Sequence, residues 1–359
     1  MVNIITEHAF SSSYWCSQYL RGIKHEAKRK NIQINITEDI RYIKNHSKES
    51  NVAILIGTSL PWLYDTVSSL REFGVRAVIL SAQKRQNLGC GVSYVTMDYE
   101  DALEKLMYYF NKIGRRKAAL FAINPDSATD QNKRMAFLRS ESNSEEDIYY
   151  FNATLEDACR SLYDNIEKYD AVICANNISG IVLSKFLREQ NISIPADIHI
   201  AEFGDFSEHI QSEGRTLIRI KAVEAGKLAV RCVRLLFGHP ELSSVSLNVK
   251  CDIVTENGII DFSNEELKSS DFISKPEPQK ELRDEHISNA LMHEKILCMC
   301  DRVDIEILKS IIAHESYSKI AVKSHISENT IGYRIKRLMQ FAPTATKEEM
   351  INALKPYLD

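Results

Sequence analysis

Residues 325–338 have the residue types and spacing of a short helix with one buried side and one basic side. Ser327 is predicted to be the helix N-cap, accepting a hydrogen bond from the backbone N–H of Asn329 or Thr330. Apolar residues follow at the i, i+4, i+7 spacing of a helix that is buried along one side: Ile331, Ile335 and Leu338. Larger polar and basic side chains cover its open side: Tyr333, Arg334, Lys336 and Arg337.

A shorter helix is predicted just before this one, over about 317–324, with apolar residues in its centre. Only a few residues separate the two helices, so the connection must be a tight turn. Two helices joined in this way form a helix-turn-helix, whose second helix can enter the major groove of DNA. The alternative interpretation is a helical bundle whose basic face is only solvated.

The segment from about 303 to 358 resembles the LuxR-type DNA-binding domain, a unit of four helices. The matching stretches are 304–313 for the first helix, 318–321 for the second, 326–331 for the turn and third, and 347–354 for the fourth. One position departs from the family pattern. Gly332 stands where relatives often carry a basic DNA contact, and glycine costs about 1 kcal/mol of helix stability relative to alanine.

This resemblance implies that the turn and the third helix contact DNA. The expected contact residues are Ser327, Asn329, Thr330, Tyr333, Arg334, Lys336 and Arg337. Because Gly332 has no side chain to offer, Tyr333 and Lys336 are expected at base edges. Arg334 and Arg337 are then expected nearer to phosphate.

The composition limits what the rest of the chain can be. A chain of 359 residues predicts two or three folded units, and 44% hydrophobic with 26% charged residues is typical of soluble proteins. The net charge of −4 argues against a surface that binds polyanions everywhere, so any nucleic-acid contact must be local. The sequence has no run of eighteen apolar residues and no signal-peptide pattern at its start. We expect a cytoplasmic protein without a membrane span.

Catalytic and metal-binding patterns are weak. The eight cysteines form no disulfide framework, which fits a reducing compartment. Cys298 and Cys300, with His293 nearby, could supply half a metal site, but structural zinc ligands usually come at C-x₂₋₄-C spacing and in fours. The sequence has no P-loop, G-x-S-x-G or HExxH motif. We therefore predict neither an enzyme nor a bound cofactor or metal.

From residue 2 to about 262, short apolar strands alternate with helices. The predicted strands are 3–6, 32–36, 52–56, 77–80, 92–97, 118–123, 148–151, 171–174, 198–203 and 217–220. Apolar strands that alternate with amphipathic helices predict parallel sheets covered on both faces. About 260 residues are too many for one open sheet, so two α/β lobes are predicted.

This region resembles the ligand-binding core of the LacI-type (lactose and purine repressor) family, which has the fold of sugar-binding periplasmic proteins. The motifs that carry the resemblance, in the family's order, are 13–15 with 20–23, 97–98 with 112–117, 175–177, 194–198 with 203–205, and 216–219 with Gly226. The resemblance implies two doubly wound parallel lobes of the periplasmic-binding-protein type 1 class. The chain would pass between them three times, with a ligand cleft in between.

The implied domains follow from both resemblances. A two-lobed ligand-binding domain spans 1–262, with lobe 1 at about 2–114 and 218–239 and lobe 2 at about 115–217 and 240–260. A linker and connector helix span 263–300, and an all-α helix-turn-helix domain spans 301–359. The connector could pair two chains or cover the base of the sensor, and we expect a homodimer.

Six residues are expected to line the cleft: Tyr14, Trp15, Asp98, Lys133, Asn176 and Asp205. Tyr14 or Trp15 would stack on a flat or sugar-like ligand. Lys133 stands where relatives carry an arginine, but lysine cannot make the bidentate fork. Asn176 suits hydroxyl recognition, with helix capping as its alternative. Asp98 is equally suited to a cleft acceptor and to a helix N-cap.

The ligand class is broader than a simple sugar. Gly204 stands where relatives place the first of two acidic residues, which leaves only Asp205. We expect a sugar, a nucleoside or a related metabolite as effector, and double-stranded DNA as the partner of the C-terminal domain. The alternative function is a small-molecule receptor whose C-terminal bundle docks a protein in place of DNA.

Overall fold

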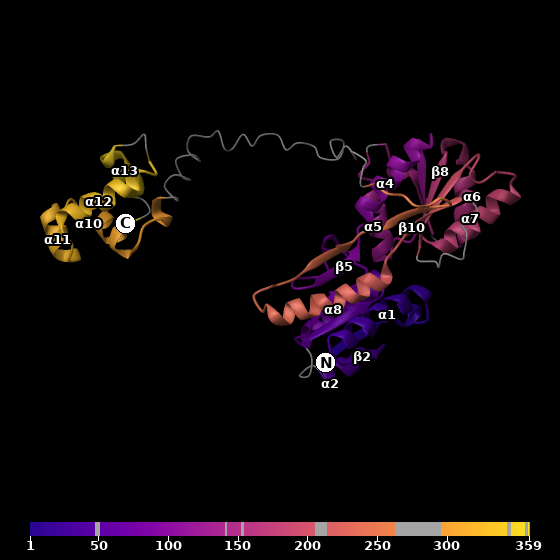
Figure 1. Ribbon diagram of the computed structural model, residues 1–359, viewed down its shortest axis with the longest axis horizontal. Coiled ribbons are helices and arrows are strands. Elements are labelled where there is room, and N and C mark those ends of the chain that lie inside the picture. Colours follow the sequence, from indigo (N-terminus) through magenta and orange to yellow (C-terminus); the bar gives the residue numbers. More distant parts are fainter. Residues whose placement is uncertain are drawn as a thin grey trace. The chain divides into compact units, whose positions relative to one another are not determined.

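The structure is a computed structural model of the chain. It describes residues 1–46, 51–140, 142–151, 154–204, 214–262, 296–342, 346–355 and 358. The chain divides into two compact units, Met1–Phe272 and Ile273–Asp359 (Figure 1). Within the described residues, none of the helices has the length and apolar character needed to cross a membrane.

The first lobe of the first unit is built on a six-stranded parallel sheet. Its strands, in spatial order, are β11 (Ser246–Val249), β5 (Ser93–Met97), β4 (Arg76–Ile79), β3 (Val52–Ile56), β1 (Val2–Thr6) and β2 (Ile34–Thr37). Every residue of β1 and β3 is buried. That pattern follows from parallel pairing, because the crossover helices cover both faces of such a sheet.

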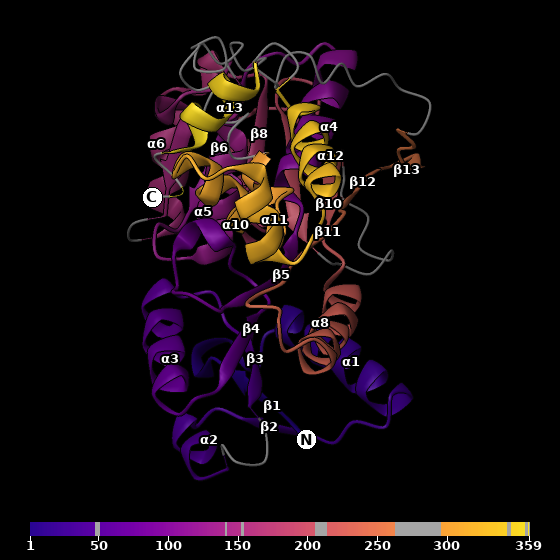
Figure 2. The same cartoon turned by 90° about the vertical axis from the view of Figure 1, so that its left-hand side faces the viewer.

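Alternate residues of these strands face different helices. Ile4 and Ile54 pack toward α1 (Tyr14–Arg29) and α8 (Ala222–Gly238), which lie side by side. Their neighbours along the strands pack toward α2 (Ile40–His46) and α3 (Leu60–Glu72). Figure 2 shows α3 on one side of the lobe 1 sheet, with α1 and α8 on the other.

The second lobe is built on a seven-stranded sheet. Its strands, in order, are β13 (Gly258–Ile259), β12 (Asp252–Thr255), β10 (Arg215–Arg219), β9 (His199–Gly204), β8 (Ala171–Cys174), β6 (Ala118–Ile123) and β7 (Ile148–Tyr150). The β10–β12 and β12–β13 pairs are antiparallel, and the other pairs of this sheet are parallel. The helices that pack on the two faces are α4 (Tyr99–Lys112) with α5 (Ala128–Phe137), and α6 (Leu155–Tyr163) with α7 (Asn177–Glu189).

The lobe boundaries differ from those expected. Helix α4 packs on α5 and β12, so the chain enters the second lobe before α4 and not near residue 114. Strand β10 lies wholly in the second sheet, and the return to the first lobe therefore follows it. Strand β11 pairs with β5 of the first sheet, although 240–260 was assigned to the second lobe. Only one of the four β11 residues is buried, so the sequence carries little strand signal there.

The described residues of the second unit include the helices α10 (Arg302–Ile312), α11 (Tyr317–Ser324), α12 (Glu328–Met339) and α13 (Lys347–Leu354). They share one apolar core. Each helix begins with a side-chain N-cap, supplied in turn by Asp301, Ser316, Ser327 and Thr346. Three residues separate α11 from α12, and the first of them, His325, has a left-handed backbone with φ of 52°. The expected pair of helices with a tight turn is therefore present.

Candidate functional site

Polar residues follow the central strands of both sheets. In the first lobe Glu7 follows β1, and Ser59 lies three residues beyond β3. In the second lobe Asn124 follows β6, and Asn176 lies two residues beyond β8. In open α/β sheets, ligands bind beyond the carboxyl ends of the strands, where the strand order reverses. Those points lie between β1 and β3 and between β6 and β8, and they define the candidate ligand cleft.

The loops after β3 and β6 are joined by backbone pairing. Ser59 and Ser127 form an isolated antiparallel β-bridge. Two backbone hydrogen bonds flank it: Leu60 N to Asp126 O at 2.8 Å and Ala128 N to Thr58 O at 2.7 Å. The two lobes are thus in direct contact at one edge of the candidate cleft.

Side chains add a second contact between the lobes. The amide nitrogen of Gln86, from the first lobe, donates to Ala128 O at 2.7 Å and to Asn132 Oδ1 at 2.9 Å. Asn132, from α5, donates in turn to Ser81 O at 3.3 Å and is buried. We call the Ser59–Ser127 bridge, its flanking bonds and the Gln86–Asn132–Ser81 bonds the lobe contact.

Glu7 occupies the amino end of α3. Its buried carboxylate accepts hydrogen bonds from Thr58 N at 2.9 Å and Ser59 N at 3.2 Å, and also from the Ser59 hydroxyl. Backbone amides at a helix start attract anions. Here a carboxylate of the chain already binds them, so an anionic ligand group would have to compete with Glu7. This arrangement favours a neutral ligand at the first-lobe side.

Lys133 is buried and surrounded by groups of the second lobe. Its Nζ lies 2.7 Å from Asp130 Oδ1 and 2.7 Å from Ala175 O. The same ammonium lies over the rings of Phe203 and Tyr99, at 5.2 and 5.8 Å from their centroids. Two of its three N–H donors are therefore used within the protein. Lys133 holds the wall of the candidate cleft together, and it has less capacity for a ligand than the sequence suggests.

The two aromatic residues at the start of α1 differ in exposure. Tyr14 is the first residue of the helix and is 53% exposed. Trp15 is partly buried against the core, and its ring lies 5.8 Å from that of Phe10 and 6.1 Å from that of Tyr19. Tyr14 thus has more ring surface free for stacking than Trp15 has.

Two of the expected polar cleft residues cap helices. Asp98 is the N-cap of α4 and accepts from Asp101 N at 3.2 Å. Asn176 is the N-cap of α7 and accepts from Ser179 N at 2.9 Å, while its side chain remains exposed. In both cases the capping alternative is realised. Asp205 lies outside the described residues.

A buried acidic group explains the glycine at 204. Asn177 Nδ2 donates to Glu202 Oε1 at 2.9 Å, and Arg215 Nε lies 3.5 Å from Glu202 Oε2. Burial raises the pKa of the Glu202 carboxyl although the positive charge of Arg215 opposes the shift. A Cβ at Gly204 would lie 1.7 Å from the Asn177 Oδ1. A side chain at 204 would therefore displace the amide that holds Glu202.

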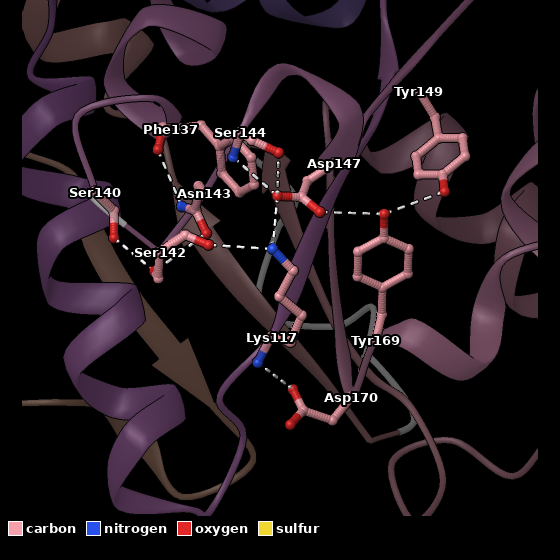
Figure 3. A network of polar contacts seen from close by, with 10 residues as sticks. All are labelled: Lys117, Phe137, Ser140, Ser142, Asn143, Ser144, Asp147, Tyr149, Tyr169 and Asp170. Carbon is pink, nitrogen blue, oxygen red and sulfur yellow. Dashed lines mark hydrogen bonds and ion pairs between the residues drawn. The ribbon is translucent and has the colours of Figure 1, made fainter.

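A polar network lies before β6, β7 and β8, at the opposite end of the second sheet from the cleft (Figure 3). Lys117 Nζ lies 2.7 Å from Asp147 Oδ2, and the Tyr169 hydroxyl donates to Asp147 Oδ1 at 3.3 Å. Burial opposes ionisation of Asp147, but hydrogen bonds from Lys117 and Ser144 outweigh it and lower the pKa of that carboxyl. The network joins strand starts and does not belong to the cleft.

The possible metal site near Cys298 and Cys300 has no set of ligands among the described residues. No group of three or more His, Cys, Asp or Glu side chains is arranged there to hold a metal ion. Cys298 is exposed, and burial raises the pKa of the Cys300 thiol to about 11. His293 lies outside the described residues.

Helix α12 has a buried side and an outward side, as the sequence predicts. The buried residues are Ile331, Ile335 and Leu338. Ser327 accepts from Thr330 N at 3.2 Å and so caps the helix. Asn329, Tyr333 and Lys336 are exposed, and the Tyr333 side chain is 70% exposed. These three follow the i, i+4, i+7 spacing, and we call them the outward stripe.

The two arginines of α12 have partners within the second unit. Arg334 Nη1 lies 2.7 Å from Asp301 Oδ2 and 2.9 Å from Asp304 Oδ1. Arg337 pairs with the other oxygen of Asp304, whose side chain is fully buried. The hydrogen bond from Arg334 lowers the pKa of Asp301 to about 2. The expected phosphate contacts of Arg334 and Arg337 would have to compete with these ion pairs.

Several site residues were missing from the sequence-based set: Glu7, Gln86, Tyr99, Asn132 and Phe203. Glu7 and Tyr99 lie one and two residues beyond the ends of β1 and β5, and that position was the available signal. Gln86 and Asn132 carry no such signal. Their roles depend on how the two lobes face each other, which a local pattern does not encode.

No protein-family model and no curated protein sequence matches the chain. Solved structures do match it over 71% of its length. A transcriptional regulator CelR–cellobiose complex matches with 17% identity and a TM-score of 0.57, over 82% of that chain. A CCPA regulator of the LacI family from Weissella paramesenteroides, with bound sucrose, matches with 16% identity and a TM-score of 0.54, over 97% of that chain.

A third structure, the putative transcriptional regulator LacI from Bacillus cereus subsp. cytotoxis, matches with 14% identity and a TM-score of 0.58, over 96% of that chain. At such identities the similarity establishes the fold alone. The first unit has the two-lobed fold of LacI-type regulators. The predicted fold class of this region is therefore confirmed.

Proposed function

We propose that this chain is a ligand-responsive, DNA-binding transcription regulator. The single observation that carries the proposal is helix α12. It follows a three-residue turn, begins with a capping serine and directs Asn329, Tyr333 and Lys336 outward from the packed core. The second helix of a helix-turn-helix enters the major groove with residues near its amino end. The fold of the first unit supports the regulatory half of the proposal, because its structural neighbours are transcription regulators.

On the DNA side, the roles of the basic residues change from those expected. Lys336 is the exposed cation of the outward stripe, so we assign the phosphate contact to it. Asp301 and Asp304 already neutralise Arg334 and Arg337. We therefore assign these two arginines to fixing the angle between α10 and α12. Ser327 and Thr330 shape the helix start, where backbone N–H groups can meet a phosphate.

On the ligand side, the proposed site is the candidate cleft between the lobes. Tyr14 supplies an exposed ring, Asn176 an exposed amide oxygen and nitrogen, and Glu7 a carboxylate near Ser59. Aromatic faces and amides suit a polyhydroxylated or nucleoside-like molecule. Cellobiose and sucrose are bound by two of the structural neighbours, and a neutral molecule of this class is what we propose here.

Regulation requires that the ligand binds two arrangements of the lobes with different affinity. We propose that closure of the cleft is one of these arrangements and that two chains act together as a homodimer. Dimers of helix-turn-helix proteins place their second helices in successive major grooves, one helical turn of DNA apart. A change in the spacing of the two helix-turn-helix units would then change DNA affinity.

The proposal is tested by the salt dependence of DNA binding by the full chain. Lys336→Ala should remove one phosphate contact, so the slope of log K against log salt should flatten by about 0.9 per protomer. Lys309, an exposed lysine on α10, is the matched control, and Lys309→Ala should leave the slope unchanged. Equal slopes for the wild type and both variants would remove α12 from the DNA interface.

A second candidate function is favoured by one observation. Val322 on α11 is 77% exposed and Tyr333 on α12 is 70% exposed, so two large hydrophobic side chains face solvent on consecutive helices. Such surfaces also bind proteins. In that case the chain is a receptor whose second unit docks a protein, and its DNA affinity would be weak and equal in the wild type and Lys336→Ala.

A further inference from the structure

The outward stripe of α12 is poor in free positive charge. Arg334 and Arg337 are paired with Asp301 and Asp304, as described above. Glu328, the first residue of the helix, is exposed and adds a negative charge to its amino-terminal end. Attraction to phosphate therefore contributes less to DNA binding by this helix than its three basic residues suggest. Beside the phosphate contact proposed for Lys336, the outward stripe offers the uncharged side chains of Asn329 and Tyr333.

We propose that Asn329 and Tyr333 are the residues that determine base specificity, with Asn329 binding an adenine and Tyr333 packing on the methyl group of a thymine. This inference rests on the proposed function, because it requires that α12 lies in the major groove. It goes further by assigning the class of base that each side chain recognises. The preferred DNA should then contain A·T pairs at both contact positions.

Asn329 has the chemistry that adenine requires. In the major groove an adenine offers its N7 as an acceptor and its N6 amino group as a donor. An asparagine side chain carries one donor and one acceptor group side by side and can bind both. Asn329 is exposed and is the second residue of α12, within the amino-terminal turn that reaches base edges in helix-turn-helix proteins.

Tyr333 lies one turn further along the same side of the helix. Four residues correspond to about 6 Å along the helix axis, which is close to two base steps of about 3.4 Å each. Its ring is 70% exposed, so a large apolar surface faces outward beside Asn329. In the major groove the group that such a surface recognises is the C5-methyl of thymine.

Gly332 allows the bases to approach this surface. A Cβ built at Gly332 meets no atom within 4 Å, so the space beside Tyr333 is open. A lysine or arginine at 332 would fill that space and add a charge next to the ring. The glycine thus leaves recognition to the two neutral side chains on either side of it.

The test replaces single atoms of the DNA. Duplexes are first selected from a randomised library with the full chain. Each adenine of a selected duplex is then replaced in turn by 7-deazaadenine, which lacks the N7 acceptor, and each thymine by deoxyuridine, which lacks the methyl group. One 7-deazaadenine should weaken binding roughly fivefold, the lower end for a bidentate contact. One deoxyuridine should weaken it about fourfold, the value for one buried methyl group.

Variants assign each effect to a side chain. Asn329→Ala should bind 7-deazaadenine and adenine duplexes equally, yet remain sensitive to deoxyuridine. Tyr333→Ala should show the reverse, and Tyr333→Phe, which keeps the ring, should remain sensitive to deoxyuridine. All three residue changes are at exposed positions, so melting curves should stay those of the wild type.

The outcomes separate this inference from the proposed function. If a duplex is selected but the wild type is insensitive to both base changes, the base assignment is overturned while DNA binding stands. Variants that keep both sensitivities would overturn it in the same way. If no duplex is enriched over the starting library, both proposals are overturned.

Discussion

Among single residues, His199 makes the free energy of unfolding depend on pH. It is buried in β9, where its Nε2 lies 2.9 Å from the Thr216 hydroxyl and its ring packs edge-on against Phe110. Burial lowers the pKa of this imidazole to about 4, and the positive charge of Arg115 acts in the same direction. The folded chain therefore keeps His199 neutral in a pH range where an unfolded chain would protonate it.

This difference predicts a loss of stability in acid. Between pH 6.5 and 4 the unfolded chain binds a proton that the folded chain does not, so the free energy of unfolding falls as the pH falls. A pKa difference of this size corresponds to about 3 kcal/mol. His199→Gln, which can still bond to Thr216, should lack this part of the loss. Urea titrations at pH 7 and pH 4.5 measure it, and parallel losses in both proteins would contradict the assignment.

Gly332 offers a test in which the substitution should raise the stability of the protein. Because its Cβ position is open and its backbone is helical, Gly332→Ala should raise the stability of the second unit by about 1 kcal/mol. Gly226→Ala is the control in the first unit, where the new Cβ would lie 2.2 Å from Tyr19 O and must destabilise. Thermal melts of the full chain report both, and a destabilised Gly332→Ala would show that the glycine is structurally required.

Among single residues, helix caps and buried positions were predicted well from the sequence. Ser327 and the apolar stripe of α12 lie where the local pattern places them, since both depend on neighbours within one or two turns. The ion pairs of Arg334 and Arg337 were not predicted, because their partners, Asp301 and Asp304, are about thirty residues away in the chain. Asp98 and Asn176 were each predicted either to line the cleft or to cap a helix. Their side-chain hydrogen bonds show the capping role, and a ligand contact by Asn176 stays a prediction.

Among the elements, α10 and α12 are joined by the buried carboxylate of Asp304. It accepts from Arg334, Arg337 and the backbone N–H of Asp301. Asp304→Asn should cost about 2 kcal/mol of second-unit stability. That is less than for a fully buried ion pair, because both guanidinium groups remain partly exposed. It should also free Arg337 and leave Arg334 paired with Asp301 alone, and so steepen the salt dependence of DNA binding.

Two measurements check this prediction. Thermal melts should show a lower transition for the second unit, while DNA titrations at several salt concentrations should show the steeper slope. Glu306→Gln, at an exposed position of the same helix, is the control and should change neither. A variant with normal stability would show that the carboxylate does not join the helices.

The central strands could be predicted, and the lobe boundaries could not. Strands β1, β3, β6 and β8 are fully buried, and β3, β6 and β8 are uninterrupted apolar runs in the sequence. Helix α4 has an apolar stripe that would look the same against either sheet. Strand β11 lies at a sheet edge and is mostly solvent-facing. Assigning both to a lobe requires knowledge of long-range pairing.

For the first unit as a whole, we expect the lobe contact to affect how readily the proposed cleft closes, because this contact joins the two lobes. Asn132→Ala removes the side-chain bonds from Gln86 and to Ser81 O. If the ligand binds the closed arrangement, losing about 1 kcal/mol from that arrangement weakens ligand binding roughly fivefold. Asn111→Ala, at an exposed position of α4, should leave ligand affinity unchanged. Unchanged affinity in Asn132→Ala would mean that the lobe contact does not take part in closure.

The measurement that tests the central claim most directly is the DNA affinity of the full chain with and without a saturating ligand. The ligand comes from a thermal-shift screen of neutral sugars and nucleosides, and the DNA is a duplex selected by the protein. We expect a change in Kd of at least about fivefold, with the same factor in ligand affinity when DNA is present, because coupling is reciprocal. A bound ligand that leaves the DNA Kd unchanged would contradict it.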